Sequence, residues 1–152
     1  MKPRLVLAFA ALLFWPAATL AGPASDLVRT FYAPVGFEAD PKLRDRFVDP
    51  ARSILDQYDR SSSGGTEVGC IDFVLAIDAQ DFDQGEINRT LVFDESVSGD
   101  TTTVTATFKV FPDDPMSRRK IEWSLKQVDG AWKIADIASR AHDWRLSTFD
   151  CR

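Results

Sequence analysis

The sequence RRKIEWSLKQVDGAWKIADIAS, residues 118–139, carries the strongest structural signal of the chain. Its apolar residues stand at every second position, as Ile121, Trp123 and Leu125 and then as Trp132 and Ile134. A period of two predicts half-buried β-strands. Asp129-Gly130 separates the two arms, and this pair favours a tight hairpin turn because glycine accepts a positive φ. The segment is therefore predicted to be an antiparallel hairpin.

The preceding residues divide into a helical half and a strand half. Apolar residues recur at helical spacing in 25–34, 40–47 and 49–60, and SSSGG at 61–65 ends the last of these segments. Period-two patterns then predict strands at 71–78, 86–94 and 101–111, with a polar turn at 79–85 between the first two. Helices followed by strands predict an α+β fold, with the N-terminal helices packed on a curved antiparallel sheet.

The first 21 residues have the layout of a cleavable signal peptide. Lys2 and Arg4 precede an apolar run from Leu5 to Trp15, and small residues follow up to Ala21. The alternative is a membrane anchor, but this run is shorter than the roughly 20 apolar residues that cross a bilayer. We therefore expect cleavage after Ala21, a single domain at 22–152, and a periplasmic or secreted location without membrane attachment.

The expected mature chain is acidic, because it keeps 16 basic and 23 acidic residues for a formal net charge of −7. Phosphate backbones and anionic membranes attract clustered Lys and Arg, so this balance argues against nucleic acid as a partner. A charged partner is expected to be basic.

Cys70 and Cys151 both lie in the part expected to be exported, where the environment is oxidising. They are predicted to form one disulfide. Two unpaired thiols remain the alternative, because pairing requires Cα atoms within about 7 Å.

The chain also resembles a known fold family. A first helix ending in Phe31-Tyr32, later strands, and the closing DGAWKIADI at 129–137 resemble the nuclear transport factor 2-like cone fold. DPKL at 40–43 and IDFVLAIDAQDFD at 71–83, with the signal, resemble an uncharacterised family of small exported bacterial proteins of that fold. The resemblance implies a conical domain that encloses a pocket. It transfers no catalytic residue, because this fold supports many unrelated functions.

Four residues are candidates for such a pocket: Asp136, Arg89, Tyr32 and Trp132. Under strict alternation Asp136 shares an apolar face with Trp132, and Arg89 shares one with its apolar strand neighbours, so the two charges would meet inside the cone. The alternatives are a structural ion pair, or a β-bulge that turns Asp136 outward.

No metal site or cofactor is predicted. Asp78, Asp81 and Asp83 supply oxygen ligands but lack the spacing of a calcium loop, so a solvated rim is expected. His142, the single histidine, supports neither a zinc site nor a serine-based triad.

Three functions follow from these expectations. The first is an exported, non-catalytic binding domain that engages a small ligand or a protein through the pocket or its rim. The second is an immunity-type protein whose acidic surface covers the basic cleft of a secreted toxin. The third is a small-molecule isomerase or dehydratase that uses Asp136 with Tyr32 or Arg89. A homodimer through the open sheet face would fit the fold.

Overall fold

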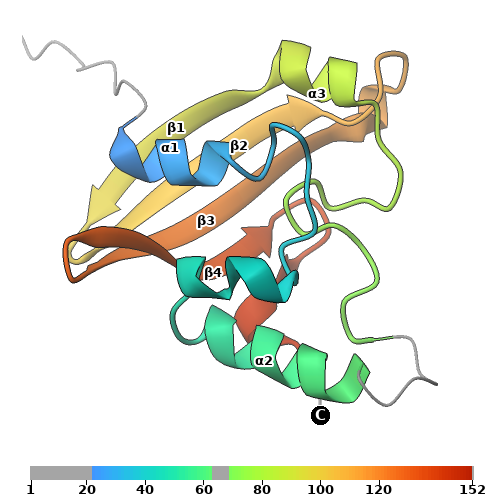
Figure 1. Ribbon diagram of the computed structural model, residues 1–152. Helices are drawn as coiled ribbons and strands as arrows, with labels where there is room; N and C mark the ends of the chain where they lie inside the picture. Colours follow the sequence, from blue (N-terminus) through green and yellow to red (C-terminus); the bar gives the residue numbers. More distant parts are fainter. Residues whose placement is uncertain (1–21, 63–68, 152) are drawn as a thin grey trace, which may run out of the picture.

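The computed structural model describes residues 22–62 and 69–151 (Figure 1). The expected signal peptide, residues 1–21, lies outside the described residues. The elements are, in order, α1 (Pro23–Arg29), η1 (Pro41–Arg46), α2 (Ala51–Ser62), α3 (Gln84–Thr90), β1 (Val92–Ser98), β2 (Thr101–Lys109), η2 (Pro115–Ser117), β3 (Arg118–Val128), β4 (Ala131–Ser139), β5 (Trp144–Arg145) and η3 (Leu146–Thr148).

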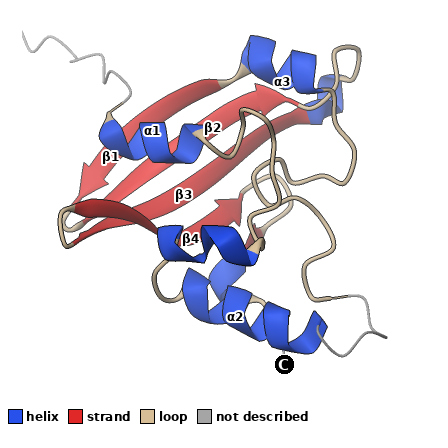
Figure 2. Ribbon diagram, viewed as in Figure 1, coloured by secondary structure: helices blue, strands red, loops and turns tan. Residues whose placement is uncertain are grey.

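The strands form one five-stranded antiparallel sheet in the order β1-β2-β3-β4-β5 (Figure 2). The predicted hairpin is confirmed: β3 pairs with β4 from Val128 opposite Ala131. Asp129 and Gly130 form its turn with φ values of 52° and 78°, which is the left-handed region that such a turn requires.

The helices cover one face of this sheet, which we call the inner face (Figure 1). On β2 every second residue is buried, and these residues face the helices. Large side chains fill the space between the layers, and those of Phe31, Tyr32, Phe47, Phe108 and Trp123 are fully buried. The α+β expectation is confirmed. Within the described residues no helix is long and apolar enough to span a membrane.

The strand predicted at 71–78 is wrong. Leu75, Ala76 and Ile77 are buried consecutively, and the chain turns back on itself through a hydrogen bond from the Val74 backbone N to the Ala79 backbone O, 3.1 Å. The period-two pattern misled because the segment crosses the core as a buried turn.

The strand predicted at 86–94 is wrong in its first half. Residues up to Thr90 belong to α3, and β1 begins at Val92. The Asp83 carboxylate accepts a hydrogen bond from the Glu86 backbone N at 2.8 Å, so it caps the helix. This cap favours a helix where hydrophobic alternation alone suggested a strand.

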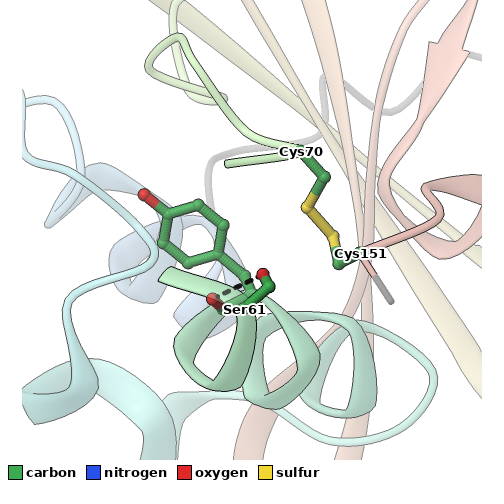
Figure 3. The surroundings of a disulfide bond; sticks show 4 residues. Ser61, Cys70 and Cys151 are labelled. Atoms are coloured by element: carbon green, nitrogen blue, oxygen red, sulfur yellow. Dashed lines mark hydrogen bonds between the residues drawn. A yellow bond between two sulfur atoms is a disulfide. The ribbon is translucent and has the colours of Figure 1, made fainter. Parts of the chain in front are cut away.

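The predicted disulfide is confirmed, with the Cα atoms of Cys70 and Cys151 5.1 Å apart. Figure 3 shows the bond beside the last turn of α2, close to Ser61. It ties the C-terminal tail to the segment that follows α2.

Candidate functional site

The four pocket candidates do not converge, and Asp136 shows one reason. In the β3-β4 ladder Asp136 pairs with Ser124 while Ile134 pairs with Leu125, so Ala135 is the extra residue of a β-bulge. The bulge moves Asp136 to the outer face of the sheet, away from Ile134. The structure thus follows the alternative in which a β-bulge turns Asp136 outward.

On the outer face Asp136 is 7% exposed because the C-terminal tail covers it. Its carboxylate accepts hydrogen bonds from the Ser147 Oγ at 2.7 Å and the Ser147 backbone N at 3.1 Å. The Arg145 guanidinium lies 3.0 Å away. These contacts make Asp136 the anchor of the tail.

Arg89 and Tyr32 lie in separate environments. Arg89 is on α3, where its guanidinium pairs with Glu86 at 2.6 Å and its side chain is 67% exposed. Tyr32 is in the core, where its hydroxyl donates to the Ala76 backbone O at 2.7 Å and accepts from the Trp123 Nε1 at 3.2 Å. Burial raises the pKa of this phenol well above its usual value.

Trp132, the fourth candidate, is half-buried against the core. Aromatic side chains thus occupy the space in which a cone pocket was expected. The isomerase or dehydratase alternative requires Asp136 beside Tyr32 or Arg89. In the described part of the chain Asp136 forms no hydrogen bond or ion pair with either residue.

Glu38 is a buried carboxylate that sequence reasoning missed. It is fully buried and accepts hydrogen bonds from the backbone N atoms of Leu75, at 3.0 Å, and Ala76, at 2.8 Å. Desolvation raises the pKa of this carboxyl from 4.5 to about 7, although the hydrogen bonds oppose the shift. A charged residue between Phe37 and Ala39 was the available signal. Both hydrogen bonds lie inside the fold, so Glu38 fixes the buried turn.

Asp78 is a second buried carboxylate with several partners. It has a positive φ of 53°, and its side chain accepts hydrogen bonds from the Ser139 Oγ at 2.6 Å and the Trp144 Nε1 at 2.7 Å. The His142 Nδ1 lies 2.6 Å from the same carboxylate. Ser139 therefore donates to the acid and not to the imidazole, which is not the order of a nucleophilic triad.

The three carboxylates expected to form a solvated rim, Asp78, Asp81 and Asp83, do not share one environment. Asp78 is in the interior, whereas Asp81 and Asp83 are exposed at the end of the sheet beside α3. No group of His, Cys, Asp or Glu in the described residues is placed to hold a metal ion.

The hollows on the surface of the described residues include the following two. One of about 560 Å³ is over β4 and the tail, with Glu122, Arg140, Trp144 and Arg145 in its wall. Three of its charged side chains are in ion pairs, since Glu122 contacts Arg140 at 2.6 Å and Arg145 contacts Asp136, and Asp143 lies beside them. The second hollow, of about 430 Å³, has mostly apolar walls, which are Phe37, Ile71, Phe73 and Val74, with Asp72 and Gln80 beside them.

The connection between β2 and β3, residues 111–116, is an exposed apolar and acidic loop that we call the β2-β3 tip. Met116 is 82% exposed and Phe111 is 38% exposed. Asp113 and Asp114 lie between them and are exposed as well. Figure 1 shows this loop beside α3, at the end of the sheet opposite the two hairpin turns.

Hydrogen bonds hold the β2-β3 tip in one shape. The Ser117 Oγ donates to the Phe111 backbone O at 2.8 Å, and the Asp114 carboxylate accepts from the Met116 backbone N at 2.8 Å. The Asp83 backbone N donates to the Val110 backbone O at 2.9 Å. This last bond brings the acidic segment 81–83 beside the tip.

The comparisons with known proteins give one structural relative. No protein-family model matches the sequence, and no curated protein is similar to it. Among solved structures, a chain in the crystal structure of the type VI native effector-immunity complex Tae3-Tai3 from Ralstonia pickettii has a similar fold, with a TM-score of 0.52. The identity is 16%, and the match covers 80% of this chain and 97% of that chain. This likeness shows the fold alone, and the nuclear transport factor 2-like resemblance stays a prediction.

Proposed function

We propose that this protein is an immunity-type partner that binds a secreted effector and blocks it. The observation that carries the proposal is the similarity to a chain of an effector-immunity complex over 80% of this chain and 97% of that one. The proposal selects the second of the three functions expected from the sequence, and it makes the partner a protein.

Of the two roles in such a complex, the composition and contacts of this chain favour immunity. Both cysteines are joined in a disulfide, so neither is available as a thiol nucleophile. The buried carboxylates of Glu38, Asp78 and Asp136 are held by internal hydrogen bonds that fix loops and the tail. The chain is acidic overall, which suits a basic partner.

The β2-β3 tip is the surface best suited to such a partner. An active cleft is concave, so the element that enters it must protrude, whereas the 430 Å³ hollow can only receive a side chain. Methionine and aromatic side chains contribute strongly at interfaces, and a loop already held in shape loses little entropy on binding. Asp81 and Asp113 beside the apolar pair would face cationic residues at the mouth of the cleft.

An immunity role predicts that a neighbouring gene encodes a secreted effector, and the test uses that predicted effector. The mature protein is expected to bind that effector in calorimetry and to keep cells alive when both are directed to the periplasm. If the wild-type protein neither binds nor protects, the proposed function is overturned.

Substitutions test the role of the β2-β3 tip separately from the immunity function. Phe111→Ala with Met116→Ala is expected to weaken binding at least tenfold, the scale of a hot-spot loss. Val97→Ala is the matched control, because Val97 is 73% exposed but lies next to the β1-β2 turn, at the opposite end of the sheet. Binding by the tip variant equal to that of the control would reject the tip while the immunity function stands.

A further inference from the structure

The first helix lacks a capping side chain of its own. Its N-cap residue is Gly22, and Ser25 is buried inside the first turn. Glu95 of β1 takes over this role from across the fold. Its Oε2 accepts hydrogen bonds from the Ser25 Oγ at 2.8 Å, the Ser25 backbone N at 3.2 Å and the Gly22 backbone N at 3.1 Å.

Glycine leaves room for this close approach. A Cβ on Gly22 would stand 2.9 Å from the Glu95 Oε1, so the Glu95 side chain would have to shift from its present position. The absence of a side chain lets the carboxylate reach the Gly22 nitrogen directly. Residue 22 is also the first residue after the predicted signal-peptide cut.

We propose that cleavage falls between Ala21 and Gly22 and that the new amino terminus is a structural part of the mature fold. Hydrolysis adds one water across the peptide bond, which leaves a carboxylate on Ala21 and an ammonium group on Gly22. The nitrogen that donated one amide hydrogen to Glu95 then carries a positive charge at the same place. A neutral hydrogen bond becomes an ion pair that fastens α1 to β1.

Glu95 determines whether this charge stabilises or destabilises the fold. The first turn of a helix carries partial positive charge, so an ammonium group there is repelled by the helix dipole. The Glu95 carboxylate at 3.1 Å from the nitrogen offsets that repulsion, because an opposite charge at hydrogen-bonding distance favours the charged form. Without Glu95 the same cleavage would bring no gain.

The first measurement is the intact mass of the protein purified from the periplasm of a bacterial host. The expected mass is that of residues 22–152 with the disulfide formed. A chain that begins at any other residue overturns the proposal, because its ammonium group would not lie at Glu95.

The second measurement compares melting temperatures of the chain that begins at Gly22 and of one that keeps Ala21. Both retain the Gly22 nitrogen as a donor, and they differ in whether the ammonium group stands on Gly22 or one residue before it. We expect the chain that begins at Gly22 to melt about 2–5 °C higher. In the Glu95→Gln background the difference is expected to vanish or to reverse sign.

Asp94→Asn is the matched control. Asp94 is the neighbouring carboxylate on β1, but it pairs with Thr105 and points to the outer face. The difference between the two chain lengths should persist in this variant. An equal difference in the Glu95→Gln and Asp94→Asn backgrounds, or no difference in the wild type, contradicts the proposed ion pair.

Discussion

The Asp136 carboxylate binds Ser147 and Arg145, and so holds the C-terminal tail against β4. Asp136→Asn removes the charge and turns an amide N–H₂ toward one of these donors. We expect the free energy of unfolding to fall by about 2–3 kcal/mol, measured by urea titration.

The control for that variant is Glu122→Gln, which removes a carboxylate from an ion pair whose arginine, Arg140, is 72% exposed. Solvent screens such an exposed pair, so it contributes little to stability. Similar losses for the two variants would mean that Asp136 does not anchor the tail.

Glu38 gives the protein a pH dependence of known sign. Its carboxyl has a pKa of about 7 when folded, against 4.5 ordinarily, so the folded state binds more protons than the unfolded state between these values. The contribution of this carboxyl to stability therefore falls as pH rises from 4.5 to 7, by about 3 kcal/mol in total, and levels off outside that window.

The measurement is the difference in unfolding free energy between the wild type and Glu38→Gln from pH 4 to pH 8. The glutamine cannot titrate, so the difference isolates this carboxyl. It should decrease through the window and level off above pH 7. A flat difference would show that the Glu38 carboxyl does not change its pKa on folding.

These two residues also show what a sequence can reveal about single side chains. The outward Asp136 was an open alternative, because one inserted residue reverses the facing of a strand and leaves no mark in the pattern. Glu38 binds backbone atoms of Leu75 and Ala76, far along the chain. No local spacing encodes such a pair.

Among the secondary-structure elements, those with explicit local signals were predicted best. The β3-β4 hairpin followed from Asp129-Gly130 and from alternation on both arms. Residues 71–78 alternate just as clearly, yet the backbone N–H groups of Leu75 and Ala76 bind the Glu38 carboxylate. Those of Ile77 and Asp78 bind the Val74 carbonyl, so the segment forms a turn and not a strand of the sheet. Alternation predicts a strand only where a neighbouring strand exists, and the neighbour is a property of the tertiary fold.

The Cys70–Cys151 disulfide joins residues 81 positions apart. The chain-entropy model assigns a loop of this length about 4.5 kcal/mol of stabilisation. Cys70→Ser with Cys151→Ser is therefore expected to lower the unfolding free energy by several kcal/mol.

Reductant provides the check on this element. It should lower the urea midpoint of the wild type and leave that of the double variant unchanged. Equal midpoints for the wild type with and without reductant would mean that the bond adds nothing to stability.

At the scale of the whole molecule, the net negative charge predicts how the proposed complex forms. Opposite charges accelerate encounter, and salt screens them. We expect the association rate with the effector to fall steeply between low and physiological ionic strength, with a smaller change in the dissociation rate, as measured by surface plasmon resonance.

Asp113→Asn should reduce this salt dependence, because Asp113 belongs to the β2-β3 tip. Asp100→Asn is the control, since Asp100 is an exposed carboxylate at the β1-β2 turn. An association rate that does not change with ionic strength would contradict electrostatic steering, but it would not contradict binding itself.

Export, signal cleavage and dimerisation stay predictions at this scale. The α+β class was predictable because the order of helices and strands limits how the two layers can pack. The interior of the domain was not, since a pattern of buried residues does not reveal whether the space between layers is hollow or filled by Phe31, Tyr32 and Trp123.

The extra residue at Ala135 also has an evolutionary consequence. Loss of that one codon would restore a regular ladder and would leave Asp136 opposite Ser124 on the outer face of the sheet. A relative that lacks the insertion should therefore still be able to carry aspartate at this position and to hold its C-terminal tail in the same way. When such chains are aligned, the gap belongs between Ile134 and Asp136.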